Sequence, residues 1–387
     1  MKHSSKLLIA VAVLAACSVQ PPPPNFYDPA GLALDHPPGD VLRSQPFPGA
    51  PDGATATRLL YTSTAPDGTP IVVSGFVVVP SAAAPAGGRP VVAWLHPATG
   101  VARGCAPSLG PSAFAQIQGL AAFLSAGYAV VATDYPGLGG PGAHPFLVGG
   151  SEARAALDSV RAVQHLPAVD ASRRFVVWGH SQGGHAALFT AQLAARYAPE
   201  LQLVGAATAA PATNVAAIVE QPGDSPLWGA LLSYTVWSWT RVFGLDASAI
   251  VAPATAPKIA RTAEDCLESA EQLTRLRADA APLQGQPVDP SGRWQDLLTE
   301  NDPQPWAIHV PVFIAQGTVD SVIPPALTQS FARRLCAANV PVRLLTMPGV
   351  DHYTIGMRSA GAAAAWIGER FSGIAAPDDC KGGLPKS

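Results

Sequence analysis

The feature that most constrains the fold is an abrupt junction between a strand pattern and a helix pattern at residues 173–197. An apolar run at residues 174–178 is typical of a buried strand, and a periodic, alanine-rich stretch at residues 185–197 is typical of a helix. The sequence Gly-His-Ser-Gln-Gly joins the two, with Ser181 at its centre. The small residues around this serine predict a sharp, cramped turn that lifts its hydroxyl above the end of a sheet.

Strand and helix patterns alternate along most of the chain. Strands are predicted at residues 91–95, 129–133, 174–178, 204–209, 312–316 and 342–347, and helices at 113–126, 151–166, 185–197, 326–337 and 358–371. Two earlier β-rich runs at 55–62 and 71–79 flank a Pro-Asp-Gly turn and predict a hairpin. The pattern indicates an α/β fold, with a mostly parallel sheet and helices on both faces. Residues 214–308 break the alternation, and we interpret them as a helical insertion between the sixth and seventh predicted strands.

The composition is that of a globular protein with a large core. Of the 387 residues, 48% are hydrophobic and 13% are charged, and the net charge is −3. No long basic run occurs, so no nucleic-acid partner is expected. His144 and His309 have no companions at ligand spacing, and no C-x-x-C or H-x-x-x-H pattern occurs. We therefore expect neither a metal nor a cofactor.

The N-terminus predicts export. Lys2 and Lys6 precede a short apolar run at residues 7–16, which is typical of a secretory signal rather than of a membrane span or a core helix. The run ends in Leu-Ala-Ala-Cys, which resembles the bacterial lipoprotein box. We expect Cys17 to be lipidated and to attach the protein to the outer side of the cytoplasmic membrane, in the periplasm or at the cell surface. Secretion after cleavage nearby is the alternative.

These patterns divide the chain into five segments. We predict a signal at residues 1–17, a proline-rich tether at 18–50, the body of the protein at 51–213 and 309–387, and the insertion at 214–308. The tether includes the run Pro21–Pro24, which favours an extended conformation with few hydrogen bonds.

The five cysteines are consistent with an exported protein. If Cys17 carries the lipid, the other four form an even set that allows two disulfides in three connectivities. Cys336 and Cys380 lie near each other in the C-terminal part, which favours pairing them and leaves Cys105 with Cys266.

A serine hydroxyl is a poor nucleophile until a base takes its proton, and two later strands end in suitable partners. Asp320 follows the strand at 312–316, and His352 follows the strand at 342–347. The order Ser, Asp, His and the positions at strand ends predict a catalytic triad. Asp320 would orient the imidazole, while His352 would act first as base and then as acid. Asp351 is a rival acid, but a chain neighbour rarely faces the same ring.

The developing oxyanion is expected to bind two backbone N–H groups. One is that of Gln182, directly after the serine, and the other comes from the loop at residues 96–100, from Ala98 or Thr99. The Thr99 hydroxyl could add a donor; the alternative is that this loop is only a turn. His180 and His185 beside the serine are expected to serve local packing.

The insertion contains the most aromatic stretch of the chain, at residues 225–245. We interpret its aromatic residues as a wall for an acyl chain or as a lid that binds a lipid–water interface; they include Trp228, Tyr234, Trp237 and Trp239. Packing of the insertion on the body is the alternative. A membrane span is disfavoured by Arg241 and several hydroxyl residues.

With the motifs GHSQGGHAAL, HPATG, GCAPS, ATDYPGLGGPGAHPF and QGTVDSVIPP, the chain resembles the secretory lipase family of α/β-hydrolases from about residue 26 to residue 379. The resemblance implies an α/β-hydrolase fold with a helical lid between the sixth and seventh strands. It also implies a triad of Ser181, Asp320 and His352. Disulfides Cys105–Cys266 and Cys336–Cys380 are implied as well. The lipid anchor at Cys17 departs from the family pattern.

We therefore expect an exported serine ester hydrolase, a triacylglycerol lipase or a carboxylesterase, that acts on lipid or small-molecule esters through an acyl-enzyme. One alternative is an acyltransferase or peptidase on the same fold. No charged cluster that could hold a peptide terminus stands out in the insertion, which disfavours a peptidase. The other alternative is a non-catalytic, surface-anchored binding protein, which the presence of all three triad residues disfavours.

Overall fold

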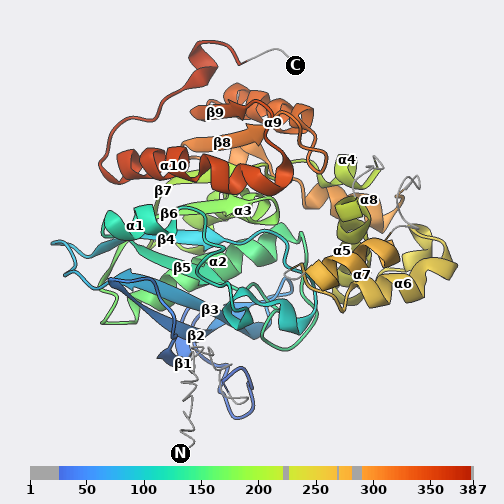
Figure 1. The fold of residues 1–387 in the computed structure, drawn as a ribbon, viewed down its shortest axis with the longest axis horizontal. Helices are drawn as coiled ribbons and strands as arrows, with labels where there is room; N and C mark the ends of the chain where they lie inside the picture. Colours follow the sequence, from blue (N-terminus) through green and yellow to red (C-terminus); the bar gives the residue numbers. More distant parts are fainter. Residues whose placement is uncertain (1–25, 221–225, 268–269, 281–289, 385–387) are drawn as a thin grey trace, which may run out of the picture.

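The computed structural model describes residues 26–220, 226–267, 270–280 and 290–384, and its centre is a nine-stranded sheet (Figure 1). The strands follow the order β1-β2-β3-β5-β4-β6-β7-β8-β9. Pairing is antiparallel from β1 through β3 to β5 and parallel from β5 to β9. The strands are β1 Val41–Pro46, β2 Ala54–Thr64, β3 Pro70–Pro80, β4 Arg89–Leu95, β5 Ala129–Thr133, β6 Ala171–His180, β7 Gln202–Ala209, β8 Val312–Gly317 and β9 Val342–Met347.

Helices cover both faces of the sheet, as predicted. The helices that cover the body are α1 Leu120–Ser125, α2 Gly149–Gln164, α3 Gln182–Tyr197, α9 Pro325–Ala337 and α10 His352–Phe371. Strand β4 explains the two layers, because alternate side chains of a strand point to opposite faces. Val91, Ala93 and Leu95 belong to the core under α2, α3 and α9. Val92 and Trp94 belong to the core under α1 and α10.

Two predicted helices have different starts in the structure. The helix expected at 113–126 is confined to α1, because Gly119 adopts φ 88° directly before it and only turns and bends precede. The helix expected at 358–371 begins six residues earlier, at His352, where the Asp351 carboxylate accepts a hydrogen bond from the Thr354 N–H at 2.9 Å. This cap also turns Asp351 away from the neighbouring imidazole.

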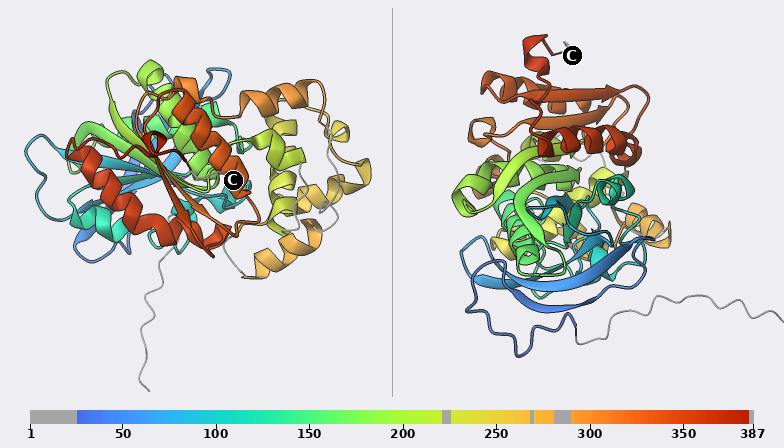
Figure 2. Two further views of the ribbon diagram at one scale, coloured as in Figure 1. Left: turned by 90° about the horizontal axis from the view of Figure 1, so that it is seen from above. Right: turned by 90° about the vertical axis from the view of Figure 1, so that its left-hand side faces the viewer.

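The helical insertion lies between β7 and β8, which are the sixth and seventh of the predicted strands. Its helices are α4 Val215–Glu220, α5 Pro226–Val242, α6 Ala256–Thr262, α7 Ala270–Ala280 and α8 Arg293–Glu300. They gather beside the sheet rather than on its faces (Figures 1 and 2). The insertion has its own core, which extends onto the body at Phe146, Leu147 and Ile323. These body residues lie near the carboxyl ends of the parallel strands.

The predicted tether at residues 18–50 is too long. Phe26 and Tyr27 are buried against Leu60 and Val72, and the Tyr27 hydroxyl lies 2.8 Å from the Ser108 Oγ. Residues 41–46 form the edge strand β1, which pairs with β2. Burial of these two aromatic side chains stabilises the packing of the segment on the sheet. The proline-rich composition of the segment gives no indication of this burial. The signal, Cys17 and the run Pro21–Pro24 lie outside the described residues.

The structure forms two disulfides, Cys105–Cys266 and Cys336–Cys380, with Cα–Cα distances of 5.3 Å and 5.4 Å. The first joins the insertion to the segment after β4, and the second joins α9 to the C-terminal segment. Within the described parts of the chain, no helix combines the length and the hydrophobicity needed to cross a membrane.

Candidate active site

Ser181 occupies a strained turn between β6 and α3, with φ 56° and ψ −118°. Non-glycine residues rarely adopt a positive φ, and such strain is concentrated at functional sites. The neighbouring positions must be glycine because the backbone leaves no space there for a Cβ. A Cβ at Gly179 would collide with the Gly183 carbonyl oxygen, and a Cβ at Gly183 would collide with the Leu95 carbonyl oxygen. The local sequence therefore allows the backbone to turn tightly enough to present the serine at the start of α3.

Ser181, His352 and Asp320 form one hydrogen-bonded row. The Nε2 of His352 lies 2.9 Å from the Ser181 Oγ, and its Nδ1 lies 2.8 Å from the Asp320 Oδ2. All three side chains are buried and come from the carboxyl ends of β6, β8 and β9. The structure thus brings together three residues that are far apart in the sequence, in an order and at distances suited to proton transfer from the serine.

The environment of Asp320 favours its ionised form. Its Oδ1 accepts hydrogen bonds from the N–H groups of Val322 and Ile323, at 2.9 Å and 2.8 Å. Burial alone would raise the pKa of Asp320, but the hydrogen bond and charge of His352, together with these backbone donors, lower it below its ordinary value. A carboxylate in this state can hold the His352 Nδ1–H and stabilise an imidazolium.

His180, directly before the serine, packs its ring 5.0 Å from that of His352. Burial, with a further contribution from the charge of His352, lowers the pKa of His180 to about 3. His180 therefore stays neutral and serves packing, as expected.

His185 was also assigned to packing, but it binds a buried carboxylate, Glu152, at 2.7 Å. In the described part of the chain, no group of three His, Cys, Asp or Glu side chains is arranged to hold a metal ion.

Of the two candidates for the second oxyanion donor, Ala98 has the better position. Ala98, Ser181 and Gln182 line one cavity. The Thr99 carbonyl instead accepts a hydrogen bond from the Leu267 N–H of the insertion, at 2.8 Å. The Thr99 hydroxyl is buried and has no partner among the described residues. The Gln182 N–H lies in the first turn of α3, where the free amides of a helix favour negative charge.

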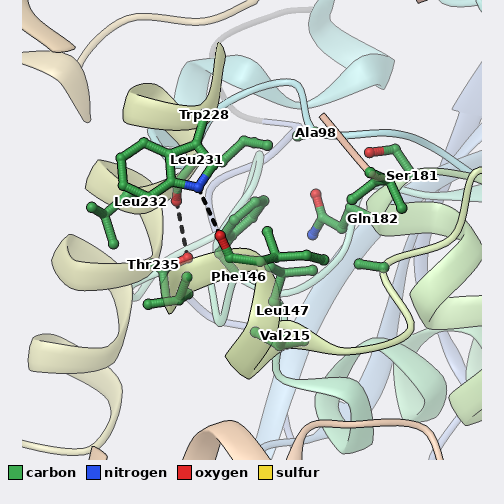
Figure 3. A pocket seen from close by; sticks show the side chains of 14 residues that line it. Ala98, Phe146, Leu147, Ser181, Gln182, Val215, Trp228, Leu231, Leu232 and Thr235 are labelled. Atoms are coloured by element: carbon green, nitrogen blue, oxygen red, sulfur yellow. Dashed lines mark hydrogen bonds between the residues drawn. The ribbon is translucent and has the colours of Figure 1, made fainter. Parts of the chain in front are cut away.

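An apolar cavity extends from Ser181 into the insertion (Figure 3). Figure 3 shows Ser181, Gln182 and Ala98 on one side of it and the α5 residues Trp228, Leu231, Leu232 and Thr235 on the other. The remaining lining is apolar and consists of Phe146, Leu147, Ala212, Val215, Ile218, Val219 and Ile323. The position of the Trp228 ring is fixed, because its Nε1–H donates to the Ile218 carbonyl at 2.7 Å.

Only one of the four predicted aromatic substrate residues lines this cavity, namely Trp228. Tyr234 is buried and donates to the Asp265 carbonyl at 3.0 Å. Trp239 stacks on Trp294 with ring centroids 5.8 Å apart, and Trp237 lies under the Arg241 guanidinium at 4.3 Å. Trp237 packs within the insertion, whereas Tyr234 and Trp239 also contact the body: the Tyr234 ring lies 5.8 Å from the Phe146 ring, and the Trp239 Nε1–H donates to the Phe146 carbonyl at 2.8 Å. All three lie on faces of α5 other than the one that lines the cavity. The aliphatic lining was missed, since the sequence does not indicate which face of a hydrophobic helix meets the serine.

The strained serine, the hydrogen-bonded row and the sheet with its insertion define an α/β-hydrolase. A solved structure with a similar fold is that of Candida antarctica lipase A in its closed state, at a TM-score of 0.72 and 20% identity, over 90% of this chain and 86% of that chain. The sequence model of the secretory lipases matches residues 112–237 and 295–379, which is more than half of the chain. The protein therefore belongs to the secretory lipase family and is an ester hydrolase of the lipase or esterase type.

Two curated relatives cover most of the chain. Lipase 6 of Candida albicans is 25% identical over 404 residues, which is 94% of this chain and 84% of the relative. A Mycobacterium tuberculosis protein named as a probable inactive lipase is 27% identical over 385 residues, which is 90% of this chain and 82% of the relative. One relative is thus named as a lipase and the other as a probable inactive lipase, so the residues of the site must be weighed individually.

Proposed function

We propose that the protein is an exported serine hydrolase that cleaves carboxylic esters of fatty acids by way of an acyl-enzyme on Ser181. The observation that carries the proposal is the row Ser181–His352–Asp320 at the mouth of an apolar cavity. The three triad side chains are in hydrogen-bonding contact, which supports activity in spite of the relative named as inactive.

The geometry accounts for each proton in the reaction. His352 Nε2 takes the Ser181 proton as the Oγ attacks the ester carbonyl carbon, and the resulting oxyanion binds the N–H groups of Gln182 and Ala98. The imidazolium then protonates the leaving alcohol, which leaves the acyl group on the Ser181 Oγ. A water molecule then loses a proton to His352 as its oxygen attacks the acyl carbonyl carbon, and the imidazolium returns that proton to the Ser181 Oγ as the fatty acid leaves. Throughout, Asp320 holds the Nδ1–H and keeps the ring in place.

The cavity supports a fatty acyl chain as the acyl part of the substrate. Its lining is almost entirely apolar and starts directly at Ser181, but its free volume is only about 20 Å³, so we propose that α5 moves aside before an acyl chain on the reacting carbonyl leaves water along this lining. The Trp228 ring, held by the Ile218 carbonyl, forms part of the insertion wall of this cavity. We propose that this wall limits the acyl length, and that the enzyme acts as a lipase or a carboxylesterase on such esters.

Export is part of the proposal. The two disulfides are characteristic of proteins that fold in an oxidising compartment, and the family is that of secretory lipases. The signal pattern at residues 1–17 and the lipobox cysteine Cys17 support attachment to a membrane by a lipid. Mass spectrometry of the native N-terminus tests this, because a diacylated Cys17 or an unmodified cut near it gives different masses.

Hydrolysis of an ester series from acetyl to oleoyl, with Ser181→Ala as the blank, tests the catalytic proposal. We expect Ser181-dependent rates on several esters and a preference for the chain lengths that the cavity accepts. Rates that rise when the ester forms a separate phase would indicate a lipase, and rates confined to soluble esters would indicate a carboxylesterase. Rates that are equal in wild type and Ser181→Ala, or absent on every ester, would contradict the proposal.

A further inference from the structure

A buried carboxylate that the triad does not use lies under the first turn of α3. Glu152, in the first turn of α2, is fully buried at 0% exposure. Its Oε1 accepts from the Gln182 Nε2 at 2.9 Å, and its Oε2 lies 2.7 Å from the His185 Nδ1. Burying a carboxylate is costly unless it is paired and hydrogen-bonded. Both of its partners belong to the turn of helix that begins at the nucleophile.

The partners of His185 determine where its protons lie. Its Nε2 lies 2.8 Å from the Asn301 carbonyl oxygen, which can only accept, so this nitrogen carries a hydrogen. Its Nδ1 faces the Glu152 carboxylate. Burial alone would lower the pKa of His185, but the charge and the hydrogen bond of Glu152 outweigh burial and raise it. His185 and Glu152 therefore form a buried ion pair.

The amide of Gln182 is oriented by the same cluster. His144 Nδ1 lies 2.9 Å from the Pro136 carbonyl, so it carries the hydrogen, and burial, the largest cause, lowers the pKa of His144 to about 3. Its Nε2 is then a free acceptor, 3.1 Å from the Gln182 Nε2. The two hydrogens of the Gln182 amide thus have two acceptors, His144 and Glu152. A flipped amide would place its oxygen against the Glu152 carboxylate, so only one orientation is stable.

We infer that Glu152 is a positioning residue for the oxyanion: its carboxylate holds the side chains of Gln182 and His185, and thereby fixes the first turn of α3 that presents the Gln182 N–H. The inference rests on the proposed function, because Gln182 is a donor only if Ser181 reacts with a carbonyl. Glu152 touches neither the substrate nor the triad and acts through Gln182. A shift of a donor by about 1 Å can cost roughly a hundredfold in rate, so this support matters.

The cluster also reaches the insertion. The Asn301 carbonyl that binds His185 follows α8, and the Asn301 Oδ1 accepts from the Gly149 N–H at 2.9 Å. The next residue, Asp302, accepts from the Val215 N–H at the start of α4. Glu152 is therefore two hydrogen bonds, by way of His185, from Asn301, next to which Asp302 binds Val215 and joins the two ends of the insertion.

The test compares Glu152→Gln with Asp158→Asn, a matched variant on the same helix. Asp158 is also a fully buried carboxylate, but it binds Ser63, Arg161 and Tyr197 and does not contact the first turn of α3. The probes are p-nitrophenyl butyrate for turnover and an alkyl boronic acid as an analogue of the tetrahedral intermediate. We expect Glu152→Gln to lower kcat roughly tenfold to a hundredfold, to weaken the analogue in proportion and to change KM less than about twofold.

Asp158→Asn is expected to lower the melting temperature while kcat and the affinity for the analogue stay near wild type. The inference is overturned if Glu152→Gln keeps both wild-type values, or if the two variants lose activity in equal proportion.

If Glu152→Gln does not fold, Gln182→Met keeps the Glu152–His185 pair and, of the hydrogen bonds to Glu152, removes only the one from the Gln182 side chain. It should show the same loss confined to kcat, and wild-type kcat in that variant would equally overturn the inference. Absence of Ser181-dependent turnover in the wild type itself would count against the proposed function instead.

Discussion

The nucleophile turn and the insertion are determined in different ways. At the turn, the backbone geometry determines which residues fit, because Ser181 adopts a positive φ and Gly179 and Gly183 have no space for a Cβ. In the insertion, contacts between side chains determine how the helices pack, as in the stacking of Trp239 on Trp294. The first kind of site tolerates almost no substitution, whereas the second can be repacked. Changes near the turn should therefore alter the rate on every ester, and changes in the insertion should alter which ester is preferred.

The largest effect is expected for Asp320→Asn. An asparagine cannot stabilise the imidazolium, and it favours the wrong tautomer of His352, so kcat should fall roughly 10³–10⁴-fold on all esters. Asp351→Asn is the matched control, since Asp351 caps α10 through Thr354 and should leave kcat nearly unchanged. Steady-state rates on short and long esters measure both variants. Equal losses of kcat in Asp320→Asn and Asp351→Asn, or a loss of kcat on long esters alone, would contradict the proposed difference between the turn and the insertion.

Next in size is the effect of Trp228→Leu. A smaller side chain in the wall of the cavity should raise the ratio of kcat/KM for long over short acyl esters by roughly tenfold. Trp237→Leu is the control within the same helix, because Trp237 lies against Arg241 outside the lining. It should leave the ratio unchanged. A shift of the same size in both variants would mean that α5 acts through its stability rather than through its cavity face.

The two disulfides should differ in their effect on catalysis. Cys105–Cys266 and Cys336–Cys380 close loops with sequence separations of 161 and 44, so replacing either pair by alanine should cost about 3–5 kcal/mol of unfolding free energy. Only the first lies beside the contact between Leu267 and Thr99, next to Ala98. We expect kcat to drop several-fold without Cys105–Cys266 and to stay constant without Cys336–Cys380. Denaturant unfolding and initial rates of both double variants decide this.

The smallest effect concerns Asp302, where the insertion joins the body. Burial raises its pKa to about 6, partly offset by the Val215 N–H and the charge of His185. The folded protein therefore binds this proton more tightly than the unfolded chain, and the stability contributed by the group declines as pH rises from about 4 to about 6. Asp302→Asn keeps an acceptor for Val215 and does not titrate.

Relative to wild type, Asp302→Asn should gain on the order of 1–3 kcal/mol of unfolding free energy above pH 6 and lose that advantage near pH 4. Urea unfolding of both proteins at the two pH values measures the difference. A gain that does not depend on pH would show that titration of Asp302 is not its source.

The same contrast explains what sequence could and could not predict. Eight of the nine strands, the turn and the residues Ser181, Asp320 and His352 were recognisable from local patterns, whereas β1 at residues 41–46 falls within the predicted tether. The insertion was located between the correct strands, but three of its four aromatic candidates, Tyr234, Trp237 and Trp239, pack elsewhere. The orientation of an all-round hydrophobic helix is determined by contacts far away in the sequence. Glu152 was missed for a similar reason, because its partners on α3 are about 30 residues away.

The most direct test of the account is a pre-steady-state reaction of the wild type with an excess of p-nitrophenyl butyrate, followed by intact-protein and peptide mass spectrometry. The account predicts a burst of nitrophenol equal to the enzyme concentration and a butyryl group on the peptide that contains Ser181. Neither should appear in Ser181→Ala. Hydrolysis without a burst that persists in Ser181→Ala, or an acyl group on another residue, would contradict the assignment of Ser181 as the nucleophile.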